Sequence, residues 1–237
     1  MQADDTLTIA VASNFRSTAE KIAEAFTDEV GIPVRLSSGS TGKLYAQIVN
    51  GAPYDIFFSA DTERPRLLEE TGEAVDHSLI IYAIGKLALI SADPALQGQS
   101  CSGVLSSGSY RRIAIANPDT APYGAAAKAW LVAEGIWEEA VPKMIMGESI
   151  SQTFQFVATG NATLGIVAIS QLADSDSPVD IVCRWAIDTP KDAAVIQAGV
   201  ILSRTDNLDA ARSFMIFLGS ETAKDLISSD GYEVPAS

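Results

Sequence analysis

The chain has few of the residues that enzymes use for catalysis or that hold metal ions. Its 237 residues include one histidine, His77, and two cysteines, Cys101 and Cys183. Zinc and iron–sulfur sites need several such ligands at close spacing, which this sequence does not supply. The two cysteines are too few for a disulfide framework, but they can pair in an oxidising compartment. Sequence separation does not fix their distance, so the sequence leaves that pairing open.

Positive charge is also scarce. The chain has 16 Lys and Arg residues against 30 Asp and Glu residues, a formal net charge of −14. Nucleic-acid binding needs clustered Lys and Arg to neutralise phosphates, so this charge balance argues against it. The same balance provides no positive field to attract an anion from a distance. Any bound anion must therefore be held locally, by hydrogen bonds and dipoles.

Long apolar runs are missing as well. None approaches the ~20 residues that span a bilayer. The first residues lead directly into a predicted strand, without the charged and apolar regions of an export signal. This start suits a mature secreted protein from which a signal peptide is absent, although a cytosolic protein would begin in the same way. With 47% hydrophobic residues, the chain can bury the core of one large or two small domains.

Apolar runs of strand length alternate with segments of helical periodicity. This pattern predicts an α/β protein with mostly parallel sheets flanked by helices. The motif Ser17-Thr18-Ala19-Glu20 predicts a capping box for the first helix, and Gly31 predicts its end. The segment 97–109 is hydrophilic, with no predicted element. The predicted strands are 7–11, 32–36, 55–60, 82–91, 112–116, 144–146, 164–169, 180–185 and 194–202, and the predicted helices after the first are 44–50, 66–70, 125–134, 150–159, 209–218 and 221–228.

Two of the predicted strands, 82–91 and 194–202, are long enough to connect two lobes. We therefore expect a two-lobed fold with two hinge crossovers. Lobe I consists of residues 1–85 and 192–237, and lobe II of residues 86–191. In such folds a ligand binds at the carboxyl ends of the strands, and we expect a ligand cleft between the lobes.

Four strand-to-helix turns carry hydroxyl groups or exposed backbone N–H groups and no acidic residue at the tip. They contain Ser13-Asn14, Ser40-Thr41, Tyr123-Gly124 and Ile150-Ser151. Helix N-termini present unpaired N–H groups and the positive end of the helix dipole, which suits an anion. Helix capping alone explains one such turn. Four of them predict one shared anion pocket.

Other chemical interpretations fit less well. Gly39-Ser40-Thr41-Gly42-Lys43 has two residues between its glycines and Leu44 after the lysine, which does not match a nucleotide P-loop. A serine hydrolase needs a base, and the single histidine lies in a polar turn where a solvated side chain is the simpler interpretation. Asp61, at the end of a predicted buried strand, is interpreted as a cap for the following helix or as a pocket wall.

Nearly the whole sequence resembles the periplasmic molybdate-binding proteins, the solute receptors of molybdate ABC transporters. The segments that carry the resemblance are 12–15, 37–48, 50–61, 82–87, 117–124 and 164–168. The resemblance implies a type II periplasmic-binding-protein fold that closes on a tetrahedral oxyanion. Cys101 and Cys183 are not part of the family pattern, and Thr41 stands where the family more often has serine.

The resemblance also implies a set of oxyanion-binding residues. Ser13 and Asn14 supply the first turn of contacts, and Thr41, with its neighbour Ser40, supplies the second. Tyr123 and Ile150 fall where the family donates backbone N–H groups. The metal is then bound as an oxyanion, without direct cation ligands, catalytic residues or a cofactor.

We therefore expect a monomeric receptor for molybdate and tungstate that delivers its ligand to an ABC permease and catalyses no reaction. A donor-lined pocket rejects protonated anions, and its size separates these ligands from the smaller sulfate. The alternatives are the same fold binding another oxyanion, such as sulfate or phosphate, and a serine hydrolase using Ser13 or Ser40. A third alternative, the sensor half of a regulator, is remote because the sequence shows no DNA-binding segment.

Overall fold

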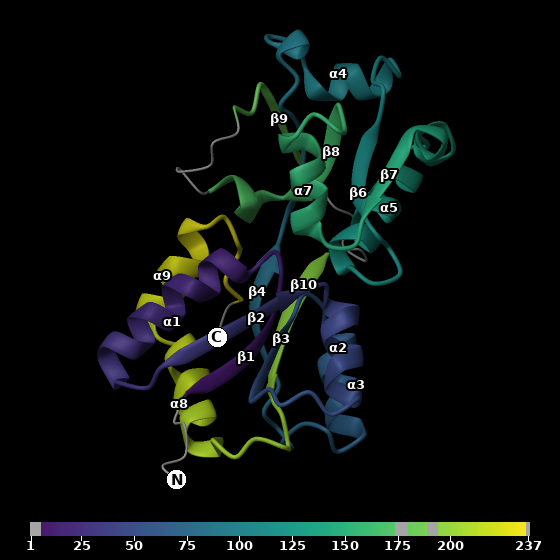
Figure 1. The fold of residues 1–237 in the computed structure, drawn as a ribbon. Coiled ribbons are helices and arrows are strands. Elements are labelled where there is room, and N and C mark those ends of the chain that lie inside the picture. Colours follow the sequence, from purple (N-terminus) through teal and green to yellow (C-terminus); the bar gives the residue numbers. More distant parts are fainter. Residues whose placement is uncertain (1–5, 174–179, 189–193, 236–237) are drawn as a thin grey trace. The chain divides into compact units, whose positions relative to one another are not determined.

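The computed structural model describes residues 6–173, 180–188 and 194–235. The chain folds into two compact units (Figure 1). Unit 1 contains Met1–Ile84 and Ile196–Ser237, and unit 2 contains Gly85–Val195. Each unit has a five-stranded mixed sheet flanked by helices. The expected α/β class is confirmed.

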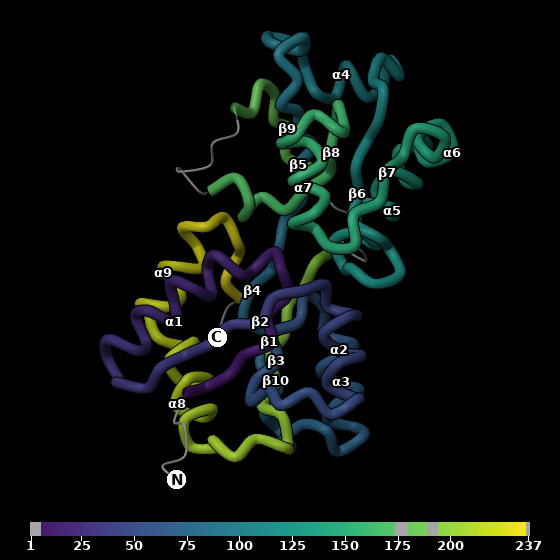
Figure 2. Tube along the Cα trace, in the orientation of Figure 1, coloured from purple at the N-terminus to yellow at the C-terminus, as the bar shows by residue number. Residues whose placement is uncertain are grey.

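The sheet of unit 1 has the strand order β2-β1-β3-β10-β4. β1 pairs in parallel with both β2 and β3, whereas β10 runs antiparallel to β3. Figure 2 shows that β4 and β10, which are far apart in the sequence, lie side by side. The strands are β1 (Leu7–Ala12), β2 (Val34–Gly39), β3 (Ile56–Ser59), β4 (Ile80–Gly85) and β10 (Val195–Ile201).

Helices cover both faces of this sheet. α1 (Arg16–Val30), α8 (Leu208–Leu218) and α9 (Glu221–Ser229) lie on one face, and α2 (Thr41–Val49) and α3 (Glu63–Glu70) lie on the other (Figure 1). Successive strand side chains point to opposite faces, so neighbouring residues enter different cores. Phe58 packs with the α1, α8 and α9 residues, and Phe57 packs with the α2 and α3 residues.

The sheet of unit 2 has the strand order β7-β6-β8-β5-β9. β6 is parallel to β7 and β8, and β5 is antiparallel to β8 and β9. The elements are β5 (Leu87–Ser91), α4 (Cys101–Ser106), β6 (Ile113–Ala116), α5 (Pro122–Ala133), α6 (Trp137–Ala140), β7 (Met144–Gly147), α7 (Ile150–Ala158), β8 (Leu164–Ala168) and β9 (Cys183–Ile187), with short 3-10 turns at Pro94–Leu96, Val141–Lys143 and Ile169–Leu172.

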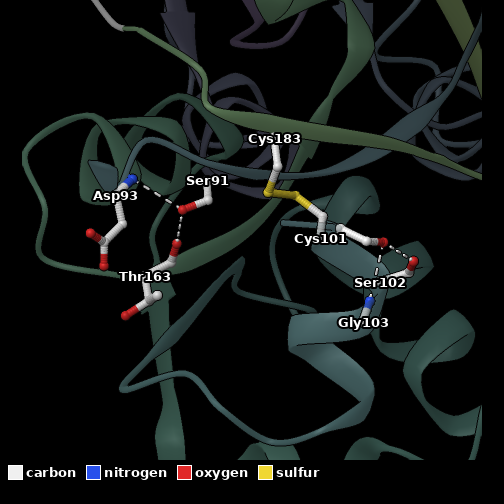
Figure 3. Close-up of a disulfide and its surroundings, with 8 residues drawn as sticks. Ser91, Asp93, Cys101, Ser102, Gly103, Thr163 and Cys183 are labelled. Atoms are coloured by element: carbon white, nitrogen blue, oxygen red, sulfur yellow. Dashed lines mark hydrogen bonds between the residues drawn. A yellow bond between two sulfur atoms is a disulfide. The ribbon is translucent and has the colours of Figure 1, made fainter. Parts of the chain in front are cut away.

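A disulfide joins α4 to β9 in unit 2 (Figure 3). Cys101 and Cys183 are 82 residues apart in the sequence, and their Cα atoms are 5.7 Å apart. The sequence left this pairing open, and the structure decides it. None of the helices in the described ranges is long and apolar enough to cross a membrane.

Three expectations about secondary structure were wrong. The capping box at Ser17–Glu20 does not form, because Phe15 occupies the cap position and α1 begins at Arg16, two residues earlier than a Ser17 cap requires. The predicted strand 82–91 is two strands, β4 and β5, which belong to different sheets. An apolar run does not encode which neighbour a strand pairs with. The hydrophilic segment 97–109 contains a helix, α4, whose N-terminus is capped by Ser100.

Candidate anion-binding site

The predicted turns of unit 1 lie next to each other, at the carboxyl ends of three neighbouring parallel strands. In the sheet register Ala12 is opposite Gly39, and Val11 is opposite Phe58. The backbone N–H of Ser13 donates to the carbonyl oxygen of Gly39 at 2.9 Å. The Ser13-Asn14 turn before α1 and the Ser40-Thr41 turn before α2 are therefore brought together.

Ser40 occupies the N-cap position of α2 but does not cap the helix. Its side chain makes no cap hydrogen bond. The residue is 4% exposed, and its Oγ is buried without a hydrogen-bond partner within the described part of the chain. Leaving a buried hydroxyl unpaired costs about 1–3 kcal/mol. Such a group in a native protein calls for an explanation, and a bound polar ligand is one.

Thr41 is the first residue of α2 and is buried. Its Oγ1 accepts a hydrogen bond from the backbone N–H of Ala60, at the end of β3, at 3.1 Å. A hydroxyl that already accepts has its proton left to donate. This contact also ties the start of α2 to the adjacent strand, so the position of the donor is fixed by the sheet.

Asn14 is buried, and its side-chain amide is engaged within the protein. Nδ2 donates to Gln197 Oε1 at 2.7 Å and to the Tyr232 hydroxyl at 3.1 Å. The Tyr232 hydroxyl in turn donates to the Asn14 carbonyl oxygen at 2.7 Å. The two amide protons are thus already used. Asn14 therefore shapes the turn through its side chain, which the sequence did not predict.

Asp61 and His77 are two further polar residues of unit 1 for which the sequence predicted a role. Asp61 accepts from the backbone N–H of Arg64 at 3.0 Å and forms an ion pair with the Arg64 side chain, so the capping interpretation is confirmed. His77 is exposed in the turn after α3, with a φ of 58°. The interpretation of a solvated loop histidine is confirmed as well.

Tyr123 and Ile150, the two residues of unit 2 predicted to donate backbone N–H groups to the anion, lie in the first turns of α5 and α7. Pro122 starts α5 and Tyr123, which is buried, follows it, whereas Ile150 starts α7. The first N–H groups of a helix have no acceptor within the helix. The strands before these helices, β6 and β7, are parallel neighbours, and Asn117 N–H donates to Gly147 O at 2.8 Å. The two helix N-termini therefore begin from the same edge of the sheet.

Glycine is required where these helices meet their strands. A Cβ on Gly124 would lie 2.3 Å from the Ala116 carbonyl oxygen. A Cβ on Gly147 would lie 2.7 Å from Thr153 Oγ1. At both glycines the backbone lies so close to its neighbours that a side chain would push the helix and the strand apart.

Acidic residues are absent from the first turns of α1, α2, α5 and α7. The short helix α4 also lacks an acidic residue there, whereas α3, α6, α8 and α9 each have at least one Asp or Glu. An acidic side chain stabilises a helix N-terminus but would repel a bound anion. In a chain with a net charge of −14, this distribution favours anion binding at the first set of helices.

Sequence reasoning missed three buried polar residues beside the Asn14 turn, which are Tyr82, Gln197 and Tyr232. A signal was present for one of them, since Gln197 interrupts an otherwise apolar strand. Burial raises the pKa of Tyr82 well above its usual value, and the nearby Tyr232 and Asp61 raise it further. Its phenol therefore stays protonated and remains a donor at neutral pH. In the described ranges no group of three or more His, Cys, Asp or Glu residues is arranged to hold a metal ion.

Comparison with known proteins places this architecture in a family. The profile of the bacterial extracellular solute-binding proteins matches residues 7–233. The molybdate-binding protein ModA of Rhodobacter capsulatus is 38% identical over 94% of this chain and 86% of its own length. ModA of Azotobacter vinelandii is 39% identical over 94% of this chain and 88% of its own length.

Solved structures agree with the sequence matches. The periplasmic molybdate-binding protein of Azotobacter vinelandii superposes with a TM-score of 0.89 at 37% identity, covering 97% of this chain and all of that one. The sulfate-binding protein SubI of Mycobacterium tuberculosis has a TM-score of 0.76 at 14% identity, covering 97% of this chain and 86% of that one, which shows a shared fold alone. The chain belongs to the bacterial extracellular solute-binding protein family.

Proposed function

We propose that this protein binds molybdate and tungstate outside the cytoplasm and delivers them to the permease of an ABC transporter. The observation that carries the proposal is the set of acid-free helix N-termini at the carboxyl ends of parallel strands. One of them holds the Ser40 hydroxyl, which has no hydrogen-bond partner among the residues that the structure describes. The identity of 38–39% to two molybdate-binding proteins supports the choice of ligand.

The proposed ligands of the anion are the hydroxyl and backbone groups of six residues. Ser13, Asn14, Ser40 and Thr41 belong to unit 1, and Tyr123 and Ile150 belong to unit 2. Asn14 contributes through its main chain, because both protons of its amide are bonded within the protein.

Neutral hydrogen-bond donors are sufficient to bind a dianion. Molybdate is a tetrahedral dianion at neutral pH, and hydrogen bonds to a charged group contribute about 1.5–3 kcal/mol each. Helix dipoles contribute roughly 0.3–1 kcal/mol apiece, and more when partly buried. Several such contacts offset the cost of removing the dianion from water without a positive side chain. The donor role of Thr41, whose oxygen already accepts from Ala60, fits a fully deprotonated anion.

The proposal includes no catalysis and no cofactor. It places the protein in the periplasm as a monomer, with the permease as its macromolecular partner. His77 lies exposed in a turn, and this position does not favour a role as the base of a hydrolase.

An anion panel tests the proposal directly. Thermal unfolding is followed with molybdate, tungstate, sulfate and phosphate, and Kd is measured by calorimetry. At a hundredfold excess over Kd, a ligand that binds only the folded state adds about 2.7 kcal/mol of stability. For a chain of this size that raises Tm by roughly 5–10 °C.

We expect this rise with molybdate and tungstate, and none with sulfate or phosphate. A rise with sulfate or phosphate alone would keep the anion site and replace the ligand. If no anion raises Tm, the proposed site is wrong. Ester hydrolysis that disappears in a His77→Ala variant would instead support an enzyme.

A further inference from the structure

Gln197 is an unusual residue for its position. It lies in β10, has no exposed surface, and sits in a strand whose other residues are apolar or alanine and glycine. Burying an amide is costly unless its polar atoms are hydrogen-bonded. The hydrogen-bond partners of Gln197 therefore indicate why this position in β10 is not occupied by an apolar residue.

The carbonyl oxygen of Gln197 accepts two hydrogen bonds. One comes from Asn14 Nδ2 at 2.7 Å, and the other from the Tyr82 hydroxyl at 3.1 Å. A carbonyl oxygen has two lone pairs, so both are used. Tyr82 belongs to β4, and its hydroxyl also lies 3.1 Å from the carbonyl oxygen of Ser59 at the end of β3. Asn14 is thus held to the two strands at which the chain leaves and re-enters unit 1.

A second residue fixes the same turn from the C-terminal segment. The Tyr232 hydroxyl accepts from Asn14 Nδ2 at 3.1 Å and donates to the Asn14 carbonyl oxygen at 2.7 Å. The next residue, Phe15, packs its ring against Tyr82 and Tyr232, with ring centroids 4.6 and 5.4 Å apart. Both the side chain and the peptide plane of Asn14 are therefore fixed.

We propose that Gln197 is a positioning residue for anion binding, which holds the Ser13-Asn14 turn in its binding geometry through the Asn14 amide. This inference rests on the proposed function. An anion site made of neutral donors depends on donors that are already oriented before the ligand arrives, because ordering them during binding lowers affinity. The Asn14 turn is oriented by three strands and the C-terminal segment.

The test compares two variants that each remove a buried hydrogen bond from unit 1. Gln197→Leu has a similar size but no acceptor for Asn14 and Tyr82. Thr18→Val removes the bond from Thr18 Oγ1 to Asp230 Oδ2, which is 2.7 Å long and joins α1 to the end of α9. Kd for molybdate and Tm without ligand are measured for both variants and for the wild type.

We expect both variants to lower Tm, and only Gln197→Leu to raise Kd, by about tenfold or more, since it removes the Gln197 acceptor that holds the Asn14 amide. A ¹⁵N–¹H spectrum shows whether the Ser13-Asn14 turn itself changes, since a loss of global stability alone would leave the amide signals of that turn in place. The side-chain and backbone amide signals of Asn14 should shift in ligand-free Gln197→Leu and stay in place in Thr18→Val.

The outcomes separate the inference from the proposed function. If the wild type binds molybdate and Gln197→Leu binds it with the same Kd, the positioning role is overturned and the proposed function stands. If the wild type binds no oxyanion, the proposed function itself is wrong. Should Gln197→Leu not fold, Gln197→Met removes the same carbonyl acceptor with an unbranched side chain of similar length, and an unchanged Kd there overturns the inference equally.

Discussion

At the scale of single residues, Ser40 and Ser91 show two opposite uses of a buried serine. The Ser91 hydroxyl donates to the Thr163 carbonyl oxygen at 2.6 Å and accepts from Asp93 N–H at 3.1 Å (Figure 3). The Ser40 hydroxyl has no such partner among the described residues. The Ser91 hydroxyl therefore stabilises the folded chain, whereas the Ser40 hydroxyl can form a hydrogen bond with a ligand.

Replacing Ser40 by alanine therefore has a distinctive expected signature. Ser40→Ala removes a buried unpaired hydroxyl, so the free energy of unfolding without ligand should stay equal or rise by up to about 1 kcal/mol. Affinity for molybdate should fall by about tenfold or more, because a charge-assisted hydrogen bond is lost. Denaturant unfolding and calorimetry measure the two quantities. Lowered stability together with unchanged affinity would contradict a ligand-binding role.

Ser91→Ala is the matched control. It removes a fully partnered buried hydroxyl from unit 2 and leaves the Thr163 carbonyl and Asp93 N–H unpaired. We expect it to lower stability by roughly 1–3 kcal/mol while Kd stays within twofold of the wild type.

At the scale of elements, the start of α5 is set by its contact with the end of β6. A Cβ on Gly124 would lie 2.3 Å from the Ala116 carbonyl oxygen, which leaves no room for a side chain. The backbone at Ala116 is held by pairing with β7, so the helix must move rather than the strand. Any such shift displaces the backbone N–H of Tyr123.

We therefore expect Gly124→Ala to weaken both folding and binding. Overpacking of this kind costs about 1–3 kcal/mol of stability. Kd should rise as well, because the N-terminus of α5 is moved away from its position. Gly103→Ala in α4 is the control, since its Cβ would lie 3.6 Å from Ser100 Cβ, an ordinary contact. Alanine favours a helix over glycine by up to about 1 kcal/mol, so this variant should be as stable as the wild type or more so. Equal Kd values for the two variants would show that the α5 N-terminus is not part of the site.

At the scale of the whole molecule, the disulfide joins two segments of unit 2 that are distant in the chain. It closes a long loop, since Cys101 and Cys183 are separated by 82 residues. Chain entropy alone predicts a stabilisation of about 4–5 kcal/mol for a loop of this length, and measured values are typically 2–4 kcal/mol. Oxidising conditions outside the cytoplasm would maintain this bond.

Reduction should therefore lower Tm by several degrees. The Tm of the native protein is compared before and after reduction, with thiol titration to confirm that both cysteines are free. A double variant, Cys101→Ala with Cys183→Ala, should unfold at the same temperature as the reduced protein and be insensitive to reductant. An unchanged Tm after complete reduction would show that the bond adds nothing to stability.

Much of the fold could be predicted because the responsible forces are local. Apolar runs marked the strands, helical periodicity marked the helices, and the residue types at Ser13, Ser40 and Tyr123 indicated helix N-termini. The start of α1 was placed wrongly because Ser17 offers a favourable capping sequence, whereas in the structure Phe15 occupies the cap position and the helix begins at Arg16.

The amino-acid sequence by itself determined the α/β class, the presence of most helices and the absence of acidic residues from the first turns of α1, α2, α5 and α7, because these depend on residues close together in the chain. Tertiary structure alone decided three further features. It divided the apolar run around Lys86 between two sheets, it brought the two cysteines within bonding distance, and it joined Asn14 to Gln197 and Tyr232. Each of these depends on which distant segments meet, and the local pattern of apolar and polar residues carries no information about that.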